Sequence, residues 1–203
     1  MEALRLKKSI EKLLDGHTNG RYLVNNPQRR KTDAESIFLM PQVTVFYAAG
    51  DFNKSKSSVN GPYHQDASFN IHVSAGTKTK VNLAVLRDLA STPEQLASAI
   101  AETDNAMMLL DEKIDDLLSL LFDIIMRPEN RNLGADYITN RWVSRISKHD
   151  PEPMGAIITG AATITLTAQC SEEVTSEEGV PAGNGAVDTV LEFGGKSKQG
   201  AIA

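Results

Sequence analysis

Cysteine is almost absent from this chain, since Cys170 is the single one among 203 residues. An intramolecular disulfide is therefore excluded, and no Cys/His cluster has the spacing of a zinc site. Long hydrophobic runs are also absent, so we predict no membrane-spanning helix. The opening stretch MEALRLKKSIEKLLDG lacks the apolar core and cleavage site of a signal peptide, which favours a cytoplasmic protein.

An excess of positive charge is lacking as well. The formal net charge is −5, which gives no support to a protein whose main role is to bind nucleic acid. Hydrophobic residues make up 41% of the chain and charged residues 23%, which is ordinary for a globular protein. The length allows one sizeable domain, or one domain with extensions.

Catalytic and ligand-binding motifs are also missing. The histidines His17, His64, His72 and His149 form no HxH or HxxxH pair. A Ser/His/Asp site around His72 would lack a nucleophile elbow, so we interpret His72 as an exposed histidine on a strand. Asp115 and Asp116 point to different sides of a helix and form no acid/base pair. We predict no enzymatic activity, no cofactor and no metal.

The clearest pattern present is an alternation of small or apolar residues with polar ones over Gly155–Cys170, GAIITGAATITLTAQC. This pattern predicts a strand with one buried face. At about 3.3 Å per residue it would span roughly 50 Å, well beyond the usual length of a strand. Either its outer part pairs with something else, or the segment is a hairpin arm or is bent at Gly160.

Three further segments alternate in the same way: Ser36–Ala49, Ala67–Ala75 and Tyr137–Ser147. Lys148–Pro153, KHDPEP, reads as a turn. We therefore expect the third segment to form an antiparallel hairpin with the long closing strand.

Helical periodicity appears at Leu4–Leu14 and more weakly at Val81–Leu89. Thr92-Pro93-Glu94-Gln95 has the sequence of a capping box and predicts a helix that runs to Met126, with or without a break near Thr103. The order of elements predicts an α+β fold, with helices packed on one face of a mostly antiparallel sheet of about four strands and a long closing β-hairpin.

Asp51–Asp66, DFNKSKSSVNGPYHQD, has no apolar periodicity and joins two predicted strands. We interpret it as a long mobile loop, and loops of this length are usually functional or disordered. We expect it to contact another protein through Asp51, Phe52, Lys54, Lys56 and Tyr63.

The composition changes after Cys170. We predict two parts, residues 1–170 as an α+β domain and residues 171–203 as an acidic, Gly-rich extension. The grouped apolar residues of the extension are Val187, Val190, Leu191 and Phe193, in VDTVLEF. We hypothesise that this segment adds a strand to, or packs in a groove of, a neighbouring subunit or protein.

The chain resembles the tail terminator (tail completion) proteins of tailed bacteriophages from Ser36 to Glu173. The resemblance lies in VTVFYAAGDFNKSKSSVNGPYHQD, which enters a long loop, in the outward-polar strand ASFNIHVSA, in the helical middle, and in the closing MGAIITGAATITLTAQCSEEV. The extension over 171–203 departs from the short members of the family, so its role is not carried over.

The resemblance implies a structural virion protein at the head–tail junction, assembled in the host cytoplasm. In that family a hexameric ring caps the tail tube, ends its polymerisation and offers a docking surface to the head connector or adaptor protein. DNA passes through the ring without sequence-specific binding. The alternatives are a head-completion adaptor or other neck protein, a tail tube subunit, a non-viral protein-binding domain, and, last, an enzyme.

Overall fold

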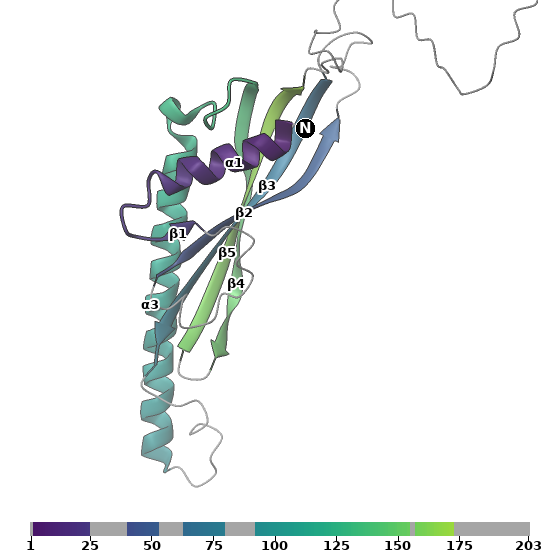
Figure 1. The fold of residues 1–203 in the computed structure, drawn as a ribbon. Coiled ribbons are helices and arrows are strands. Elements are labelled where there is room, and N and C mark those ends of the chain that lie inside the picture. Colours follow the sequence, from purple (N-terminus) through teal and green to yellow (C-terminus); the bar gives the residue numbers. More distant parts are fainter. Residues whose placement is uncertain (1, 25–39, 53–62, 80–91, 155–156, 173–203) are drawn as a thin grey trace, which may run out of the picture.

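A computed structural model describes residues 2–24, 40–52, 63–79, 92–154 and 157–172 of the chain. One layer of helices packs on one sheet (Figure 1). The elements in chain order are α1 (Glu2–Asp15), β1 (Leu23–Val24), β2 (Gln42–Phe52), β3 (Tyr63–Lys78), α3 (Pro93–Met126), the 3-10 turn η2 (Pro128–Asn130), β4 (Ile138–Met154) and β5 (Ile157–Glu172).

The sheet has the strand order β1-β2-β3-β5-β4. The short β1 pairs with β2 in parallel, and every other neighbouring pair is antiparallel, so the sheet is mixed. The α+β class agrees with the sequence pattern, but the sheet has five strands where about four were predicted. The link between β4 and β5, at residues 155–156, lies outside the described residues.

The strands are longer than predicted. β3 and β5 pair over their full lengths, from Tyr63↔Glu172 to Lys78↔Ile157. The loop prediction for Asp51–Asp66 is therefore wrong at both ends, since β2 continues to Phe52 and β3 already begins at Tyr63. Cross-strand hydrogen bonding extends these strands past the last apolar residue of each pattern, where sequence alternation gives no signal.

The turn predicted at Lys148–Pro153 is also wrong, because this segment belongs to β4. The register changes between His149 and Glu152, so Asp150 and Pro151 face one position of β5. Proline has no N–H for the ladder, and a bulge accommodates it without breaking the strand. The bulge lies on β4, and β5 runs without interruption through Gly160.

The helix predicted at Leu4–Leu14 is confirmed as α1, and the helix predicted from the capping box at Thr92 is confirmed as α3. Thr92 Oγ1 accepts a hydrogen bond from the Gln95 backbone N–H at 3.3 Å, and Gln95 Oε1 accepts one from the Thr92 N–H at 3.1 Å. α3 then runs unbroken for 34 residues. The break considered near Thr103 is absent, and its hydroxyl donates to the Ala99 carbonyl at 2.8 Å. The short helix predicted at Val81–Leu89 lies outside the described residues.

The core lies between the helices and one face of the sheet. α1 contributes Leu6, Ile10 and Leu14, and the larger part of the cluster comes from α3 and from the inward residues of β2, β3 and β5. α1 crosses near one end of the sheet, whereas α3 runs along it and extends past the strand ends with its N-terminal part (Figure 1).

Candidate assembly surface

The face of the sheet opposite the core is polar over β3 and β5, whereas Phe46 of β2 and Trp142 of β4 expose apolar side chains on it. Its side chains hydrogen-bond to one another across strands: Thr165 Oγ1 donates to Asn70 Oδ1 at 3.2 Å, and Gln169 Nε2 donates to Asp66 Oδ1 at 3.0 Å. Ser68 Oγ and Thr167 Oγ1 lie 3.4 Å apart. These pairs satisfy polar groups without a ligand, so the outward alternation produces a hydrogen-bonded surface.

His72 and His149 meet on this face. Nδ1 of His72 lies 3.3 Å and Nε2 of His149 lies 3.0 Å from the same hydroxyl, Oγ1 of Thr163, and the ring centroids are 5.9 Å apart. Burial, and to a smaller extent the positive charge of His149, lowers the pKa of His72. The interpretation of His72 as exposed is wrong, since it is half-buried. The hydroxyl bridges two imidazoles, an arrangement without the carboxylate that a catalytic triad uses.

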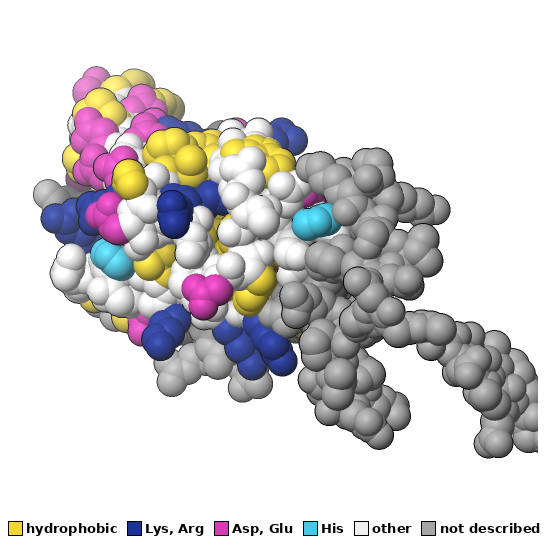
Figure 2. Space-filling view, turned by 90° about the horizontal axis from the view of Figure 1, so that it is seen from above, with side chains coloured by type: hydrophobic (Ala, Val, Ile, Leu, Met, Phe, Trp, Pro, Cys, Tyr) yellow, Lys and Arg dark blue, Asp and Glu magenta, His cyan; other side chains and the backbone are white. Residues whose placement is uncertain are grey.

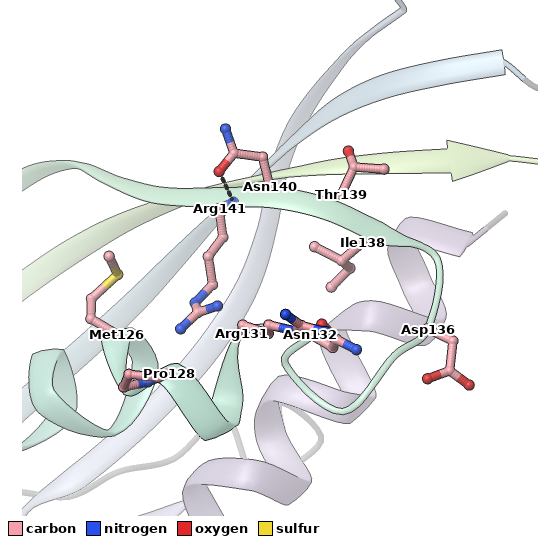
Figure 3. A pocket seen from close by; sticks show the side chains of 9 residues that line it. All are labelled: Met126, Pro128, Arg131, Asn132, Asp136, Ile138, Thr139, Asn140 and Arg141. Atoms are coloured by element: carbon pink, nitrogen blue, oxygen red, sulfur yellow. Dashed lines mark hydrogen bonds between the residues drawn. The ribbon is translucent and has the colours of Figure 1, made fainter.

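A cavity of about 710 Å³ lies beside the C-terminal end of α3, lined by residues of η2, the following turn and the start of β4. Figure 3 shows the Arg141 side chain extending from β4 toward the turn that holds Met126 and Pro128. Arg141 Nε donates to the Ile125 carbonyl at 2.9 Å, and its terminal nitrogen donates to the Arg127 carbonyl at 2.7 Å. The guanidinium therefore occupies the carbonyls that a helix leaves unpaired at its end.

Lys148, a second cationic residue of β4, contacts α3 nearer the middle of that helix. Lys148 Nζ lies 2.7 Å from Asp111 Oδ1 and 2.7 Å from Asp115 Oδ1. These two carboxylates raise the pKa of Lys148. Asp115 is thus one arm of an ion-pair clamp, and Asp116, its neighbour, is exposed. Asp111 and Asp115 thus have an ion-pair partner within the chain.

The predicted interaction residues fall into two groups. Asp51 is exposed near the end of β2 and lies opposite Asp66 of β3 in the sheet register. Phe52 lies at the end of β2, opposite Gln65, and Tyr63 is the first residue of β3. The remaining predicted residues lie outside the described residues; they are Lys54, Lys56, Val187, Val190, Leu191 and Phe193.

Gln65, Tyr47 and Gly50 pack closely together near this end of β2 and β3. The sequence did not indicate this arrangement. Gln65 is 1% exposed, and its Nε2 donates to the Tyr47 hydroxyl at 2.9 Å. A Cβ on Gly50 would clash with both groups, at 1.8 Å from Gln65 Nε2 and 2.3 Å from Tyr47 Oη. The small residue at position 50 therefore allows a buried side-chain bond, whereas the sequence pattern suggested only a strand end.

α3 presents several apolar side chains to solvent. The exposed fractions are 40% for Leu96, 47% for Ile100, 37% for Met107, 56% for Met108 and 57% for Leu109. These five lie in the N-terminal half of the helix, where Ala99, Thr103 and Ala106 are nevertheless buried; in the C-terminal half Phe122 is 38% exposed.

Within the described part of the chain, no three His, Cys, Asp or Glu side chains gather as metal ligands would. The described helices also lack the combination of length and apolar character that a membrane crossing requires. No protein-family model matches the sequence, and no significant match is found among curated proteins.

Proposed function

We propose that this protein is a structural subunit of a ring at the head–tail junction of a tailed bacteriophage, where it caps the tail tube as a tail terminator. The observation that carries the proposal is the β2–β3–β5 arm. β3 and β5 pair over all sixteen positions of each strand. Together with β2 they reach past α1, with Asp51 exposed near the tip (Figure 1).

A strand pair that reaches past α1 provides backbone and side chains for contact with another subunit. This arm leads into the segment whose sequence, VTVFYAAGDFNKSKSSVNGPYHQD, resembles the terminator family. The net charge of −5 also suits a ring through which DNA must pass without being held. The neighbours in this proposal are the tail tube protein on one side and the head connector or adaptor on the other.

Native mass spectrometry of the full chain tests the proposal, and a sixfold assembly is the expected result. The assembly should also bind the ends of purified tail tubes in electron micrographs and stop their growth. A protein that stays monomeric at all concentrations, with and without tubes, would contradict the proposal. Open-ended polymerisation would favour a tail tube subunit instead, and a stable monomer that binds an unrelated protein would favour a binding domain.

A further inference from the structure

β4 forms one edge of the described sheet, because it pairs with β5 on one side only. At the opposite edge the short β1 covers the beginning of β2. Among the described elements no counterpart of β1 lies beside β4. A long edge strand offers unpaired backbone groups to a further strand. We call residues 138–147, the first part of this strand, the β4 edge.

The β4 edge exposes an apolar side chain on each face of the sheet. Trp142 is 37% exposed and lies opposite Thr167, on the outer face. Ile146 is 47% exposed and lies opposite Ile164, whose side chain belongs to the core, so Ile146 is on the helix side. Apolar side chains exposed along an unpaired strand are typical of a surface that another segment covers.

Two further features lie beside the same edge. Phe122 of α3 is 38% exposed and follows Asp111, which contacts Lys148 of β4, by about three helical turns, so it lies on the side of α3 toward β4. The cavity of about 710 Å³ opens at the beginning of β4, where Met126 and Ile138 form part of its lining (Figure 3). A strand added here would find apolar surface on its helix side and room for a large side chain at one end.

The charges of the β4 edge favour an occupant that carries carboxylates. Residues 138–147 contain two arginines and no aspartate or glutamate. Arg141 already caps α3, whereas Arg145 is exposed and has no ion-pair partner among the described residues. Hydrophobic side chains at the surface likewise gather in patches with Lys or Arg side chains beside them (Figure 2). One cation, Arg145, is therefore available to a partner between two exposed apolar side chains.

The segment VDTVLEF, residues 187–193, has this composition. In an extended conformation Val187, Leu191 and Phe193 would lie on one side, and Asp188 would lie on the other side with Val190 and Glu192. The segment therefore offers an apolar side to the helix layer and carboxylates to Arg145. A second β4 edge as occupant would instead place two stretches with arginines and no carboxylates against each other.

The place where the chain leaves the described fold argues for a neighbouring subunit. Glu172 lies opposite Tyr63, at the tip of the β2–β3–β5 arm proposed above for subunit contact. Ser171 N donates to the Tyr137 carbonyl, so the beginning of β4 lies at the same end of the sheet. To pair antiparallel with its own β4 edge, the segment would have to run back about 30 Å and then return, a condition that a second subunit does not impose.

We infer that VDTVLEF of one subunit adds as an antiparallel strand to the β4 edge of the next. The linker of residues 173–186 spans up to about 46–50 Å when extended, enough to leave its own subunit. The two surfaces differ, so the contact is head-to-tail, the type that closes into a ring when the rotation between subunits allows. The inference rests on the proposed ring and names a contact that holds it together.

One register satisfies both faces, with Val143 and Ser144 sharing a position at the bulge. Its opposing pairs are Val187 with Ile146, Asp188 with Arg145, Val190 with Trp142, and Phe193 with Thr139, which lines the cavity.

Apolar substitutions in the full-length protein test the contact from both sides. Ile146→Lys on the β4 edge and Leu191→Lys in the segment each place a charge where apolar side chains should meet. Each should weaken assembly at least roughly tenfold, measured by sedimentation velocity over a dilution series. Leu109→Lys changes a residue of α3 that is 57% exposed and serves as the matched control, which should assemble like the unmodified chain. Thermal unfolding of the dilute, unassembled subunit should be the same in all three variants.

A charge exchange tests the register and shows whether the contact joins two subunits. Arg145→Asp and Asp188→Arg should each weaken assembly about threefold or more, since an exposed ion pair is replaced by like charges. Both changes in one chain should restore assembly. Mixing the two singly changed proteins should restore it as well, because alternating subunits then pair opposite charges at every contact. Arg21→Asp, an exposed change outside the contact, is the control.

Cross-linking identifies the subunit that receives the segment. Chains with Arg145→Cys are mixed with chains carrying Asp188→Cys, and a short bis-maleimide linker should join them into covalent dimers. Cys170 is buried and should not compete for the linker. A chain with both changes that cross-links only within itself would show that the segment docks on its own subunit, and would overturn the inference.

The outcomes separate this inference from the proposed function. If the unmodified chain forms sixfold rings that none of these changes affects, the contact is wrong and the ring proposal stands. If the changes break and restore an assembly that never binds tube ends, the contact stands and the terminator proposal fails. If Ile146→Lys breaks the rings but Leu191→Lys does not, the β4 edge pairs with another segment, and VDTVLEF is not its occupant.

Discussion

Gly160 of β5 lies directly against Ile114 of α3. A Cβ on Gly160 would lie 2.7 Å from Ile114 Cδ1 and 3.1 Å from Leu110 Cδ2. Glycine at this position therefore lets the long helix pack closely on the central part of the sheet, and any larger residue requires the side chains of Ile114 and Leu110, or the helix itself, to shift.

Gly160→Ala should accordingly destabilise the fold by about 1–3 kcal/mol, because the added methyl group overpacks the core. Ile114→Val removes the contacting Cδ1 and alone should cost about 0.5–1.5 kcal/mol. The double variant should be more stable than the sum of the two losses predicts, as a double-mutant cycle from urea unfolding would show. Strict additivity would mean that the two residues do not constrain each other.

Arg141→Ala should free the carbonyls at the end of α3. Its two hydrogen bonds involve a charged donor but are only partly shielded from water, so we expect a loss of about 1–2 kcal/mol. Amide exchange in the last turn of α3 should accelerate most. Arg145→Ala, an exposed change on the same strand, should alter stability by less than about 0.5 kcal/mol and serves as the control.

The His72–Thr163–His149 cluster predicts a pH dependence of stability. The pKa of His72 is lowered below its ordinary value of 6.5 by burial and by His149, so the folded state favours the neutral ring. The stability that the neutral ring of His72 contributes should be fully present above pH 6.5. It should be lost as the pH falls through the lowered pKa, since the unfolded chain binds the proton first. His72→Gln should flatten this part of the curve, measured as melting temperature against pH, and His149→Gln should reduce it only in part.

The Lys148 clamp should contribute little and should depend on salt. Lys148 and its two carboxylate partners are largely exposed, and such ion pairs are worth about 0–1 kcal/mol. Lys148→Met should therefore lower stability slightly at low ionic strength and not measurably at about 1 M salt, where charges are screened within about 3 Å. An equal loss at both salt concentrations would mean that Lys148 acts through packing rather than charge.

A chain that ends at Glu172 should unfold at the same temperature as the full chain, because β5 ends there and Ser171 N already donates to the Tyr137 carbonyl at 3.0 Å. If residues 173–203 tie subunits together through VDTVLEF, the shortened chain should form weaker rings. Rings of unchanged stability would remove that hypothesis, and a large drop in melting temperature would assign the segment to the subunit's own fold.

Local signals in the sequence correctly predicted several elements. The capping box at Thr92 and Gln95 fixed the start of α3, because its hydrogen bonds join residues three positions apart. The alternation from Ile158 to Cys170 predicted the long β5, since period-two burial is a property of any strand packed on one side. The helical spacing over Leu4–Leu14 likewise predicted α1; Leu6, Ile10 and Leu14 are buried as expected, whereas Leu4 is 50% exposed.

Other features depended on contacts between distant segments. KHDPEP reads as a turn, yet it forms part of β4, because pairing with β5 and a bulge overrode the local signal at Pro151. Gly50 and Gly160 look like strand interruptions but are sites of close approach. Arg141 gave no sequence signal, because the carbonyls it caps belong to a different element.

The sequence by itself therefore determined the central parts of the long helices and strands and which side of most of them is apolar, because these follow from short-range hydrogen bonding and periodicity. Only the tertiary structure decided which part of an apolar side is covered. The stripe of α3 looks uniform from Leu96 to Ile125, but Ile114 and Ile125 are buried and Leu96 and Ile100 are not. The physical reason is length, because α3 runs past the ends of the strands it packs on (Figure 1).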